Sequence, residues 1–515
     1  MISKIIEWCG KNRFLVTLAL LLVIGWGVWA VKTVPLDAIP DLSDVQVVVS
    51  AKWDRPPDVL EDQVAYPISR ALLGAPRVKY IRAQSDFGYS NVYVVFDEGT
   101  DVYWARSRVL EYLSKIQGSL PQGVKVELGP DATGVGWVYQ YALVDKTGQH
   151  SLEELKAYQD WNLKFVLQSL PGVAEVSTVG GETKEYQVEV NPAALAAYDL
   201  PFENVVKAIR DSNQEVGGGL LEMNGTEYMV RGLGYVHSLQ DLRDVVVGRD
   251  KQGTPVLLRD VGQVQLGPAL RRNVTDLNGQ GQVVGGIVTM RYGENAMNVI
   301  ARVKQKLAEL KPSLPKGVEI VPVYDRSKLI QDSVDTLMGE LAKLAIAVGI
   351  VCLVFLWNLP SVFVILITLP VAILMSFICM RYIGVTSNIM SLGGIAIAIG
   401  AMVDASIIMV ENACKRLEEW ERSGRKENRA DVILHAAMEV GPSLFMTLLV
   451  ITIGFLPIFA LQGQEGRLFK PLAYTKTFSM FFAAFLAVTV TPMLMTLFLR
   501  GKIRSEAQNP VNRIL

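Results

Sequence analysis

Apolar residues form six long runs along this chain, one near the N-terminus and five in the last third. A run of about 20 apolar residues is long enough to cross the hydrocarbon core of a membrane as a helix. The expected spans are 14–34, 336–357, 361–381, 388–413, 441–461 and 475–499. We therefore predict a membrane protein with six transmembrane α-helices, two of which are interrupted by Pro370 and Pro457.

The stretch before the first span has a different pattern. Apolar residues recur there at roughly helical spacing with charged residues between them: Ile2, Ile5, Ile6, Trp8 and Cys9 alternate with Lys4, Glu7 and Lys11. A helix with one apolar and one charged face is typical of the membrane interface. Residues 1–13 are therefore predicted to form an interfacial helix in contact with lipid.

The polar region between the first two spans, about 35–335, alternates strand-like and helix-like patterns. Strands are predicted at 45–49, 90–96, 124–128, 138–144, 173–179, 282–290 and 318–322, and helices at 57–72, 102–120, 152–170 and 296–310. Two β-α-β modules of ferredoxin-like type explain this order, so the region is predicted to be α+β.

The modules differ in continuity. The first is predicted at 35–128. The second is split into 129–180 and 276–335 by a glycine-richer insertion at 181–275. Residues 336–500 then hold the last five spans, and 501–515 form a tail.

Basic residues predict the orientation of the spans. They gather after the fourth span and in the tail: Lys415, Arg416, Arg422, Arg425, Lys426, Arg429, Arg500, Lys502, Arg504 and Arg513. Because such residues favour the cytoplasmic side, both ends of the chain are predicted to be cytoplasmic. The region 35–335 and the short loops at 382–387 and 462–474 then lie on the other side.

Composition excludes several classes of function. The 50 basic and 51 acidic residues balance, so charge does not indicate a nucleic-acid partner. The four cysteines lie in or beside apolar segments, which argues against a disulfide framework. The three histidines, His150, His237 and His435, are scattered and predict no zinc site. No nucleophile–base set or phosphate loop indicates an enzyme.

Asp404 is the strongest candidate for chemistry, because it is the one ionisable residue in the run 393–410. A carboxylate is costly in lipid, so it usually faces the protein interior, a partner or water, and marks a functional site. Burial disfavours its charged form, which suits a group that takes up and releases a proton. A structural carboxylate paired with another helix is the alternative.

Glu411 lies seven residues after Asp404, on nearly the same helix face. It is a weak candidate for the start of a proton exit path. A solvated helix end followed by basic residues explains it equally simply, and we favour that interpretation.

One helix, an external region of about 300 residues and five further helices resemble half of a resistance–nodulation–division (RND) efflux pump. Residues 35–47 (PLDAIPDLSDVQV) and 400–405 (GAMVDA), the latter followed by Glu411-Asn412-Ala413, resemble its heavy-metal branch. The resemblance covers essentially the whole chain. It implies a metal/proton antiporter in the inner membrane of a Gram-negative bacterium, with its large region in the periplasm. Proton-motive force would drive it, without a permanently bound cofactor.

The fourth span also indicates the transported ion. Pumps of this branch for divalent zinc, cobalt or cadmium typically carry an Asp six residues before the central one, where this chain has Ala398. Ala398 with Met402 instead resembles the copper(I)/silver(I) pumps, and thioethers suit such soft ions. Divalent-cation or organic-molecule efflux is the alternative.

Methionines in the membrane helices of copper/silver pumps are proposed to relay the ion. The corresponding candidates are Met390, Met402, Met409, Met480 and Met495. At about 100° per residue, Met402 and Met409 share a face, and Asp404 lies roughly 160° from Met402. The alternative is that these methionines only fill gaps in an apolar core.

Full-length members of the family repeat this unit twice. The resemblance therefore implies a C-terminal half or a second polypeptide, which would carry the periplasmic methionine cluster and the rest of the proton relay. The small residues around Asp404, such as Gly400 and Ala401, would pack against that half. The family forms homotrimers with a periplasmic adaptor (membrane fusion protein) and an outer-membrane channel, which the insertion 181–275 would face. A nonfunctional or assembly-only fragment is a further alternative.

Overall fold

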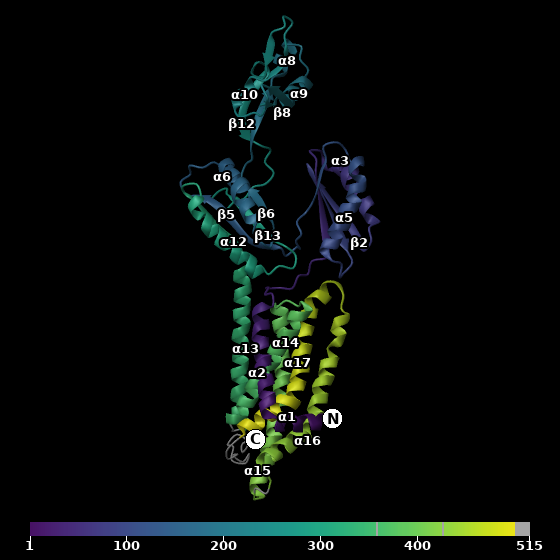
Figure 1. The fold of residues 1–515 in the computed structure, drawn as a ribbon, viewed down its shortest axis with the longest axis vertical. Helices are drawn as coiled ribbons and strands as arrows, with labels where there is room; N and C mark the ends of the chain where they lie inside the picture. The colour runs from purple at the N-terminus through teal and green to yellow at the C-terminus, as the bar shows by residue number, and fades with distance from the viewer. Residues whose placement is uncertain (357–358, 425–426, 500–515) are drawn as a thin grey trace.

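A bundle of long helices and a set of α/β parts that extend from one of its ends make up the molecule (Figure 1). The structure is a computed structural model, and it describes residues 1–356, 359–424 and 427–499. The predicted tail, 501–515, lies outside the described residues. We call the end of the bundle that carries the α/β parts the module end, and the other the far end.

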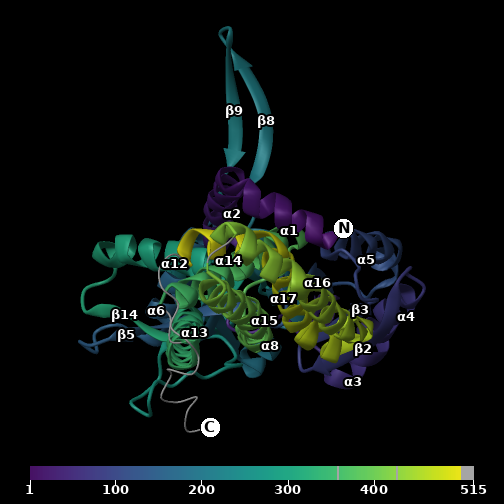
Figure 2. The same ribbon diagram turned by 90° about the horizontal axis from the view of Figure 1, so that it is seen from below.

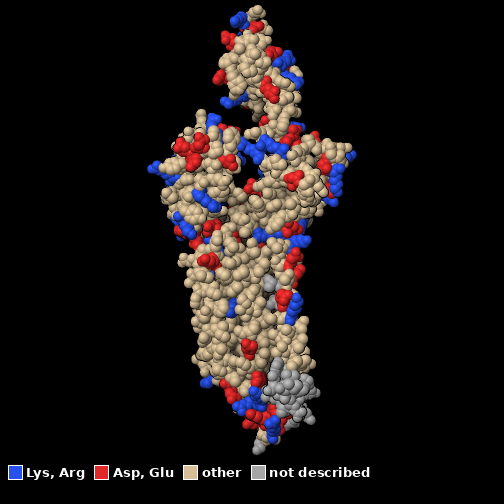
Figure 3. Space-filling model, turned by 180° about the vertical axis from the view of Figure 1, so that it is seen from behind, with Lys and Arg blue, Asp and Glu red and all other residues tan. Residues whose placement is uncertain are grey.

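Six helices in the described residues are long and apolar enough to cross a membrane, which confirms the predicted number of apolar helices of that length. They are α2 (Arg13–Thr33), α13 (Arg326–Leu356), α14 (Leu359–Ile383), α15 (Ile389–Arg422), α16 (Arg429–Gly454) and α17 (Gly463–Phe498). On the face seen in Figure 3, charged residues gather at the ends of the bundle and over the α/β parts, and the side of the bundle between them is largely uncharged. An uncharged belt of this kind suits contact with lipid.

Several predicted helix bounds are wrong. Helices α13, α16 and α17 begin well before 336, 441 and 475, and α15 continues past 413. Hydropathy detects only the part of a helix that lies in hydrocarbon, whereas polar turns continue the same hydrogen-bonding pattern into water. The predicted loop 462–474 is therefore the first part of α17. Of the basic residues predicted after the fourth span, Lys415, Arg416 and Arg422 lie in α15, Arg429 begins α16, and Arg425 and Lys426 lie outside the described residues.

The prolines also differ from prediction. Pro370 lies inside α14 as expected, whereas Pro457 lies in a short 3₁₀ segment, η5 (Leu456–Ala460), beyond the end of α16. Pro442 interrupts α16 instead, and Pro471 and Pro492 lie inside α17. Neighbouring helices in the bundle are able to satisfy the carbonyls that these prolines free.

The N-terminal helix α1 (Ile2–Lys11) lies across the far end of the bundle, close to α16 and α17 (Figures 1 and 2). Its Ile6 and Cys9 are buried, and Gly10 lies against the side chain of Leu434. The opposite face exposes the ion pair between Lys11 Nζ and Glu7 Oε1, 2.6 Å apart. An amphipathic helix is thus present, and its contact with lipid stays a prediction.

The first α/β module holds an antiparallel sheet with the strand order β2-β3-β1-β4. Its elements are β1 (Gln46–Lys52), α3 (Pro57–Leu60), η1 (Glu61–Ala65), α4 (Tyr66–Leu73), β2 (Val78–Asp86), β3 (Tyr89–Phe96), α5 (Val102–Ile116), η2 (Gln117–Ser119) and β4 (Lys125–Leu128). Strand β2 was not predicted. It is an edge strand with most side chains exposed, so its sequence lacks the apolar alternation of a half-buried strand.

The second module has the same order of strands and helices, with the insertion between its second and third strands. Its sheet order is β14-β5-β13-β6. Its elements are β5 (Trp137–Asp145), α6 (Leu152–Tyr158), η3 (Gln159–Leu163), α7 (Lys164–Gln168), β6 (Val173–Gly180), β13 (Val284–Met290), α12 (Ala296–Leu310), η4 (Lys311–Ser313) and β14 (Val318–Asp325). Numbered within each module, both sheets have the order 2-3-1-4.

The insertion forms a separate small unit with its own core around Val205, Leu258 and Val261. It contains β7 (Lys184–Val190), α8 (Pro192–Ala197), α9 (Phe202–Ser212), β8 (Val216–Met223), β9 (Thr226–Gly232), α10 (Leu239–Arg243), β10 (Val246–Arg249), β11 (Pro255–Leu257), α11 (Leu258–Val261) and β12 (Gly262–Pro268). Strands β7 and β12 pair and close it. The hairpin of β8 and β9 projects away from the rest of the molecule (Figure 2).

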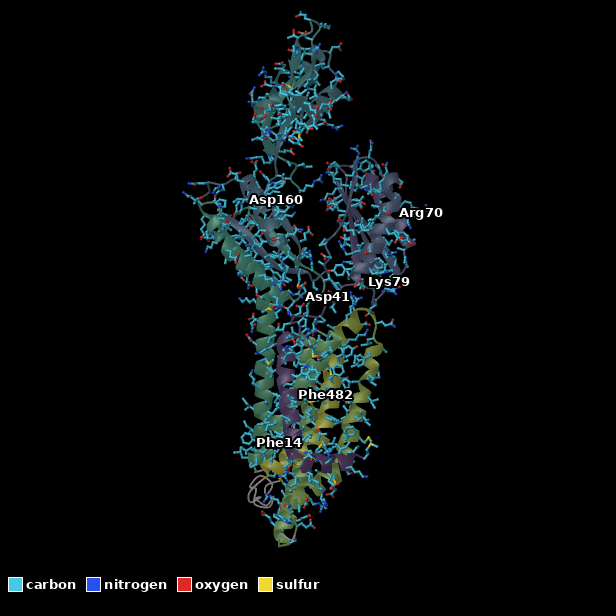
Figure 4. The ribbon with its side chains drawn as sticks, in the orientation of Figure 1. Phe14, Asp41, Arg70, Lys79, Asp160 and Phe482 are labelled. Atoms are coloured by element: carbon cyan, nitrogen blue, oxygen red, sulfur yellow. The ribbon has the colours of Figure 1, made fainter. Side chains whose placement is uncertain are left out.

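The segment 35–45 joins the bundle to the modules, and Asp41 marks its place in Figure 4, where Phe14 and Phe482 lie in the bundle. Its Pro35 carbonyl accepts a hydrogen bond from Ser387, in the loop between α14 and α15. The Arg467 side chain of α17 donates to the Ser43 carbonyl at 2.5 Å and to Asp44 at 3.0 Å. One short segment therefore contacts two parts of the bundle at the module end.

A buried ion pair holds the same segment to the second module. At the start of α13, the guanidinium of Arg326 lies 2.7 Å from Asp37 Oδ1 and also donates to the carbonyl of Val135. The Arg326 side chain is only 5% exposed and that of Asp37 20%. The transition from β14 to α13 is thus tied to the segment that leaves α2.

Candidate functional site

Helix α15 carries the candidate residue Asp404, and its start is well defined. Asn388 caps it, with its side chain accepting from the Ser391 amide at 3.0 Å, while Ser391 Oγ accepts from the Asn388 amide at 2.8 Å. A reciprocal cap of this kind satisfies amides that the first turn leaves free. Gly394 then lets α15 approach α17, because a Cβ there would lie 2.3 Å from Thr475 Oγ1.

The two faces of α15 have different surroundings. Ala398, Met402 and Met409 are buried against the rest of the bundle. Gly400, Asp404 and Ile408 are exposed on the other side. A side chain at Gly400 would meet nothing within 4 Å. The predicted separation of Asp404 from Met402 around the helix is therefore observed.

Asp404 itself has no hydrogen-bond or ion-pair partner among the residues that the structure describes. It was expected to face the protein interior, a partner or water, and in this chain it lies on the outer surface of the bundle. Its neighbours on that surface are apolar or small. The internal partner of the structural alternative is not found within the described part of the chain.

Glu411 lies two turns further along α15 and is half-buried. Its Oε1 is 2.6 Å from Lys415 Nζ, one turn on. Such an i,i+4 pair is common at a solvated helix end and contributes little to stability. This geometry favours the solvated-end interpretation of Glu411 over a proton path.

Met402 borders a small enclosed cavity of about 10 Å³ between α14, α15 and α17. Thr368, Ser406 and Thr491 also line it, and the hydroxyls of Thr368 and Ser406 are 3.4 Å apart. A volume of this size is about that of one water-sized probe. Met402 thus borders the same cavity as three hydroxyl-bearing side chains of the apolar core.

The other methionine candidates occupy different depths of the bundle. Met409, Met480 and Met495 are fully buried in the core, and Met390, near the start of α15, is half-buried. The Met409 methyl group lies 3.6 Å from the Cβ position of Gly441 on α16. The structure therefore places all five candidates in the helix bundle, four of them in one apolar core, where either a relay or simple packing is possible.

Two further buried residues of α17 were not predicted. Lys476 is only 7% exposed, and its Nζ lies 3.0 Å from the centroid of the Phe455 ring. Met493 is fully buried, and its sulfur accepts from Thr17 Oγ1 at 3.6 Å. Lys476 could have been found from the sequence, since it is a charged residue inside a predicted span. Nothing in the sequence around Met493 distinguishes it from the other methionines.

The described residues contain no group of three or more His, Cys, Asp or Glu side chains able to hold a metal ion.

Comparison with known proteins identifies a family match along nearly the whole chain. A model of the AcrB/AcrD/AcrF family matches residues 5–515. A crystal structure of a heavy metal efflux pump superposes with a TM-score of 0.83 at 30% identity, over 96% of this chain and 48% of that chain.

Curated relatives agree with this match. The chain is 52% identical over 521 residues to the cation efflux system protein CusA of Escherichia coli, across 100% of this chain and 50% of CusA. The putative cation efflux system protein SilA of Salmonella typhimurium gives the same identity and coverage. The cobalt-zinc-cadmium resistance protein CzcA of Cupriavidus metallidurans is 35% identical, across 99% of this chain and 48% of CzcA. The chain thus spans about half the length of the curated relatives it matches.

Proposed function

Because this chain belongs to the AcrB/AcrD/AcrF family of RND pumps, whose members are transporters, we propose that it forms one half of a proton-driven exporter of copper(I) and silver(I). The observation that carries this function is the division of α15 into two faces. Asp404 lies on an open face, and Met402 and Met409 lie on the buried one. Proton exchange and ion movement then use opposite sides of the same helix, so that a shift of α15 couples them.

The open face of α15 is where the second half of the pump binds. A carboxylate facing lipid is costly, so a covering partner with a polar or basic group stabilises it. Gly400 supports this role, because its missing side chain leaves room for close approach of another helix. Asp404 takes up and releases the proton at that interface.

The buried face of α15 handles the cation. Ala398 and Met402 lie one turn apart there, so this side of the helix presents a thioether and no carboxylate. Soft monovalent ions prefer thioether ligands, whereas divalent zinc and cobalt favour nitrogen and oxygen donors. Greater identity to CusA than to CzcA supports the same direction.

In this proposal the α/β modules are periplasmic, ferredoxin-like porter modules of an inner-membrane protein. The first covers 35–128, and the second covers 129–180 and 276–335. The insertion 181–275 docks toward an outer-membrane channel, and a homotrimer binds a periplasmic adaptor. Conformational cycling of the modules moves the ion outward, and the segment 35–45 transmits movement of the bundle to them.

Cysteine labelling tests the orientation. In a variant without the native cysteines, a cysteine at Ser151 is expected to react with a membrane-impermeant maleimide added outside the inner membrane. One at Ser423 is expected to react only after permeabilisation. Both positions are exposed, so accessibility depends on sidedness alone. Reversed labelling contradicts the proposed topology.

Metal resistance tests the substrate. Cells that express the complete pump are expected to tolerate silver and copper better than cells without it, with little gain against zinc or cobalt. Equal protection against zinc favours the divalent alternative.

Met402→Leu, which nearly conserves volume, tests the ligand role. It is expected to reduce silver transport by at least about tenfold, because loss of even an outer-shell partner of a metal ligand typically costs roughly 10–100-fold in affinity or activity. Met446→Leu is the matched control, because Met446 is exposed on α16 away from the core. Equal transport by both variants contradicts a role for Met402 beyond packing.

A further inference from the structure

A cavity of about 780 Å³ lies at the far end of the bundle, between the last turns of α15 and the first turns of α16. Its lining includes His435 and Met438 of α16 and Arg416, Glu419 and Glu439. The candidate residues discussed above do not border it. One of its lining residues is unusual for the helix bundle, because His435 is the one histidine in the sequence after residue 237.

His435 and Met438 are three residues apart on α16, so they lie on one face of the helix. At that spacing Cβ atoms are about 5–6 Å apart, close enough for an imidazole nitrogen and a thioether sulfur to bind one ion. His435 is exposed and Met438 half-buried, so both are reachable from the cavity. An imidazole and a thioether are suitable donors for a soft monovalent cation.

The charge of the lining favours a cation. Arg416 is already engaged, with Nη2 2.7 Å from Glu439 Oε1 and Nη1 2.8 Å from Glu419 Oε2. Glu427 adds a third carboxylate, so the described lining holds three acidic residues against one arginine. A cavity with excess negative charge raises the local concentration of cations.

The turn of α16 that follows Met438 contacts one of the buried methionines. Met438 is three residues before Gly441, which is buried and lies on the same side of α16. The Met409 methyl group lies 3.6 Å from the Cβ position of Gly441. Ile6 Cδ1 of α1 lies nearer, at 2.6 Å, so the missing side chain at Gly441 makes room for Ile6, while Met409 is in ordinary contact with the helix turn that follows Met438.

We propose that His435 and Met438 form a loading site for copper(I) or silver(I) at the far end of the bundle, from which the ion passes to Met409. The loading site rests on the function proposed above, in which this end is cytoplasmic. Zinc requires about four ligands in tetrahedral geometry. Glu419 and Glu439 of the lining already pair with Arg416, so the one nitrogen and one sulfur donor of the site disfavour zinc and leave the ion labile enough to move on.

Silver titration of the purified protein in detergent tests this site. His435→Gln and Met438→Leu are each expected to weaken the binding of one silver ion by at least about tenfold, by loss of a ligand. His237→Gln and Met446→Leu are matched controls that remove the same side chains elsewhere, and they are expected to bind silver as the parent does. Unchanged silver binding by both test variants overturns the site.

A measurement on the parent protein removes any dependence on variant folding. The chain has 3 histidines, so NMR of isotopically labelled histidine is expected to give three ring signals. Silver is expected to shift the signal that is missing from His435→Gln. If silver shifts no histidine signal, the site is wrong.

Different results would contradict the loading site and the proposed function. If the complete pump exports silver while both variants bind and export it normally, the site is wrong and the function stands. If silver binding depends on His435 but the complete pump exports no silver, the site stands and the function is wrong.

Discussion

Replacement of Asp404 by Asn is expected to leave the complete pump assembled but to reduce silver resistance to the level of cells without it. Asn keeps the size of the side chain and much of its hydrogen bonding, but it neither carries the charge nor takes up a proton. Asp404 is exposed on the face of α15 that we propose the second half to cover, so the change creates no cavity in the core of this half. Loss of function would therefore reflect lost proton exchange.

Two matched variants make this prediction specific. Asp404→Glu is expected to retain part of the resistance, because it keeps a titratable carboxyl at a shifted position. Glu411→Gln is expected to be close to the parent, since Glu411 already pairs with Lys415 near the helix end. Immunoblotting of the membrane fraction checks that all three accumulate. Full resistance in Asp404→Asn would show that the residue is structural.

Replacement of Arg326 by Gln is expected to destabilise the protein by about 3 kcal/mol, in the range found when one partner of a buried ion pair is removed. The change leaves the carboxylate of Asp37, only 20% exposed, without its cation, and the Val135 carbonyl loses a donor. Because this pair links the second module to the segment after α2, proteolysis between bundle and modules should also accelerate. Thermal unfolding of the purified protein measures the effect.

Lys146→Gln serves as the control for Arg326→Gln. Lys146 pairs with Glu319 at 2.7 Å in the same module, but both side chains are about half exposed. Exposed pairs contribute about 0–1 kcal/mol, so the unfolding temperature is expected to change little. Equal destabilisation by the two variants would contradict a special role for the buried pair.

Most helices and strands could be predicted from the spacing of apolar residues, because one face of each element is buried in a core and the other faces water. Helix α12 matches its predicted bounds, since its apolar residues recur at helical spacing over the second sheet. The edge strand β2 was missed because few of its side chains are buried. The early starts of α16 and α17 were missed because hydropathy detects only the apolar part of a helix. The helix itself begins at its cap, such as Asn428 before α16, which lies in a polar stretch.

The features of the candidate site that could be predicted from the sequence are those that depend on a single helix. The angle between Asp404 and Met402 follows from helical geometry alone, and the structure agrees. Burial depends on neighbouring elements, so the exposure of Asp404 within this half was not predictable. The cavity beside His435 requires α15 and α16 together, and their sequences lie on opposite sides of a turn. Three scattered histidines therefore gave no sign of it.

Silver-driven proton movement tests the central claim most directly. The complete pump would be reconstituted in vesicles with an acidic lumen and a pH-sensitive dye, and silver added outside. In an exchange of one proton for one silver(I) ion the two charges cancel, so the pH gradient supplies the driving force, about 1.4 kcal/mol for each tenfold difference in proton concentration. The parent is expected to raise the luminal pH as silver enters, and Asp404→Asn is expected to give no change above empty vesicles. Equal alkalinisation by the two proteins, or none by the parent, would contradict proton-driven export through Asp404.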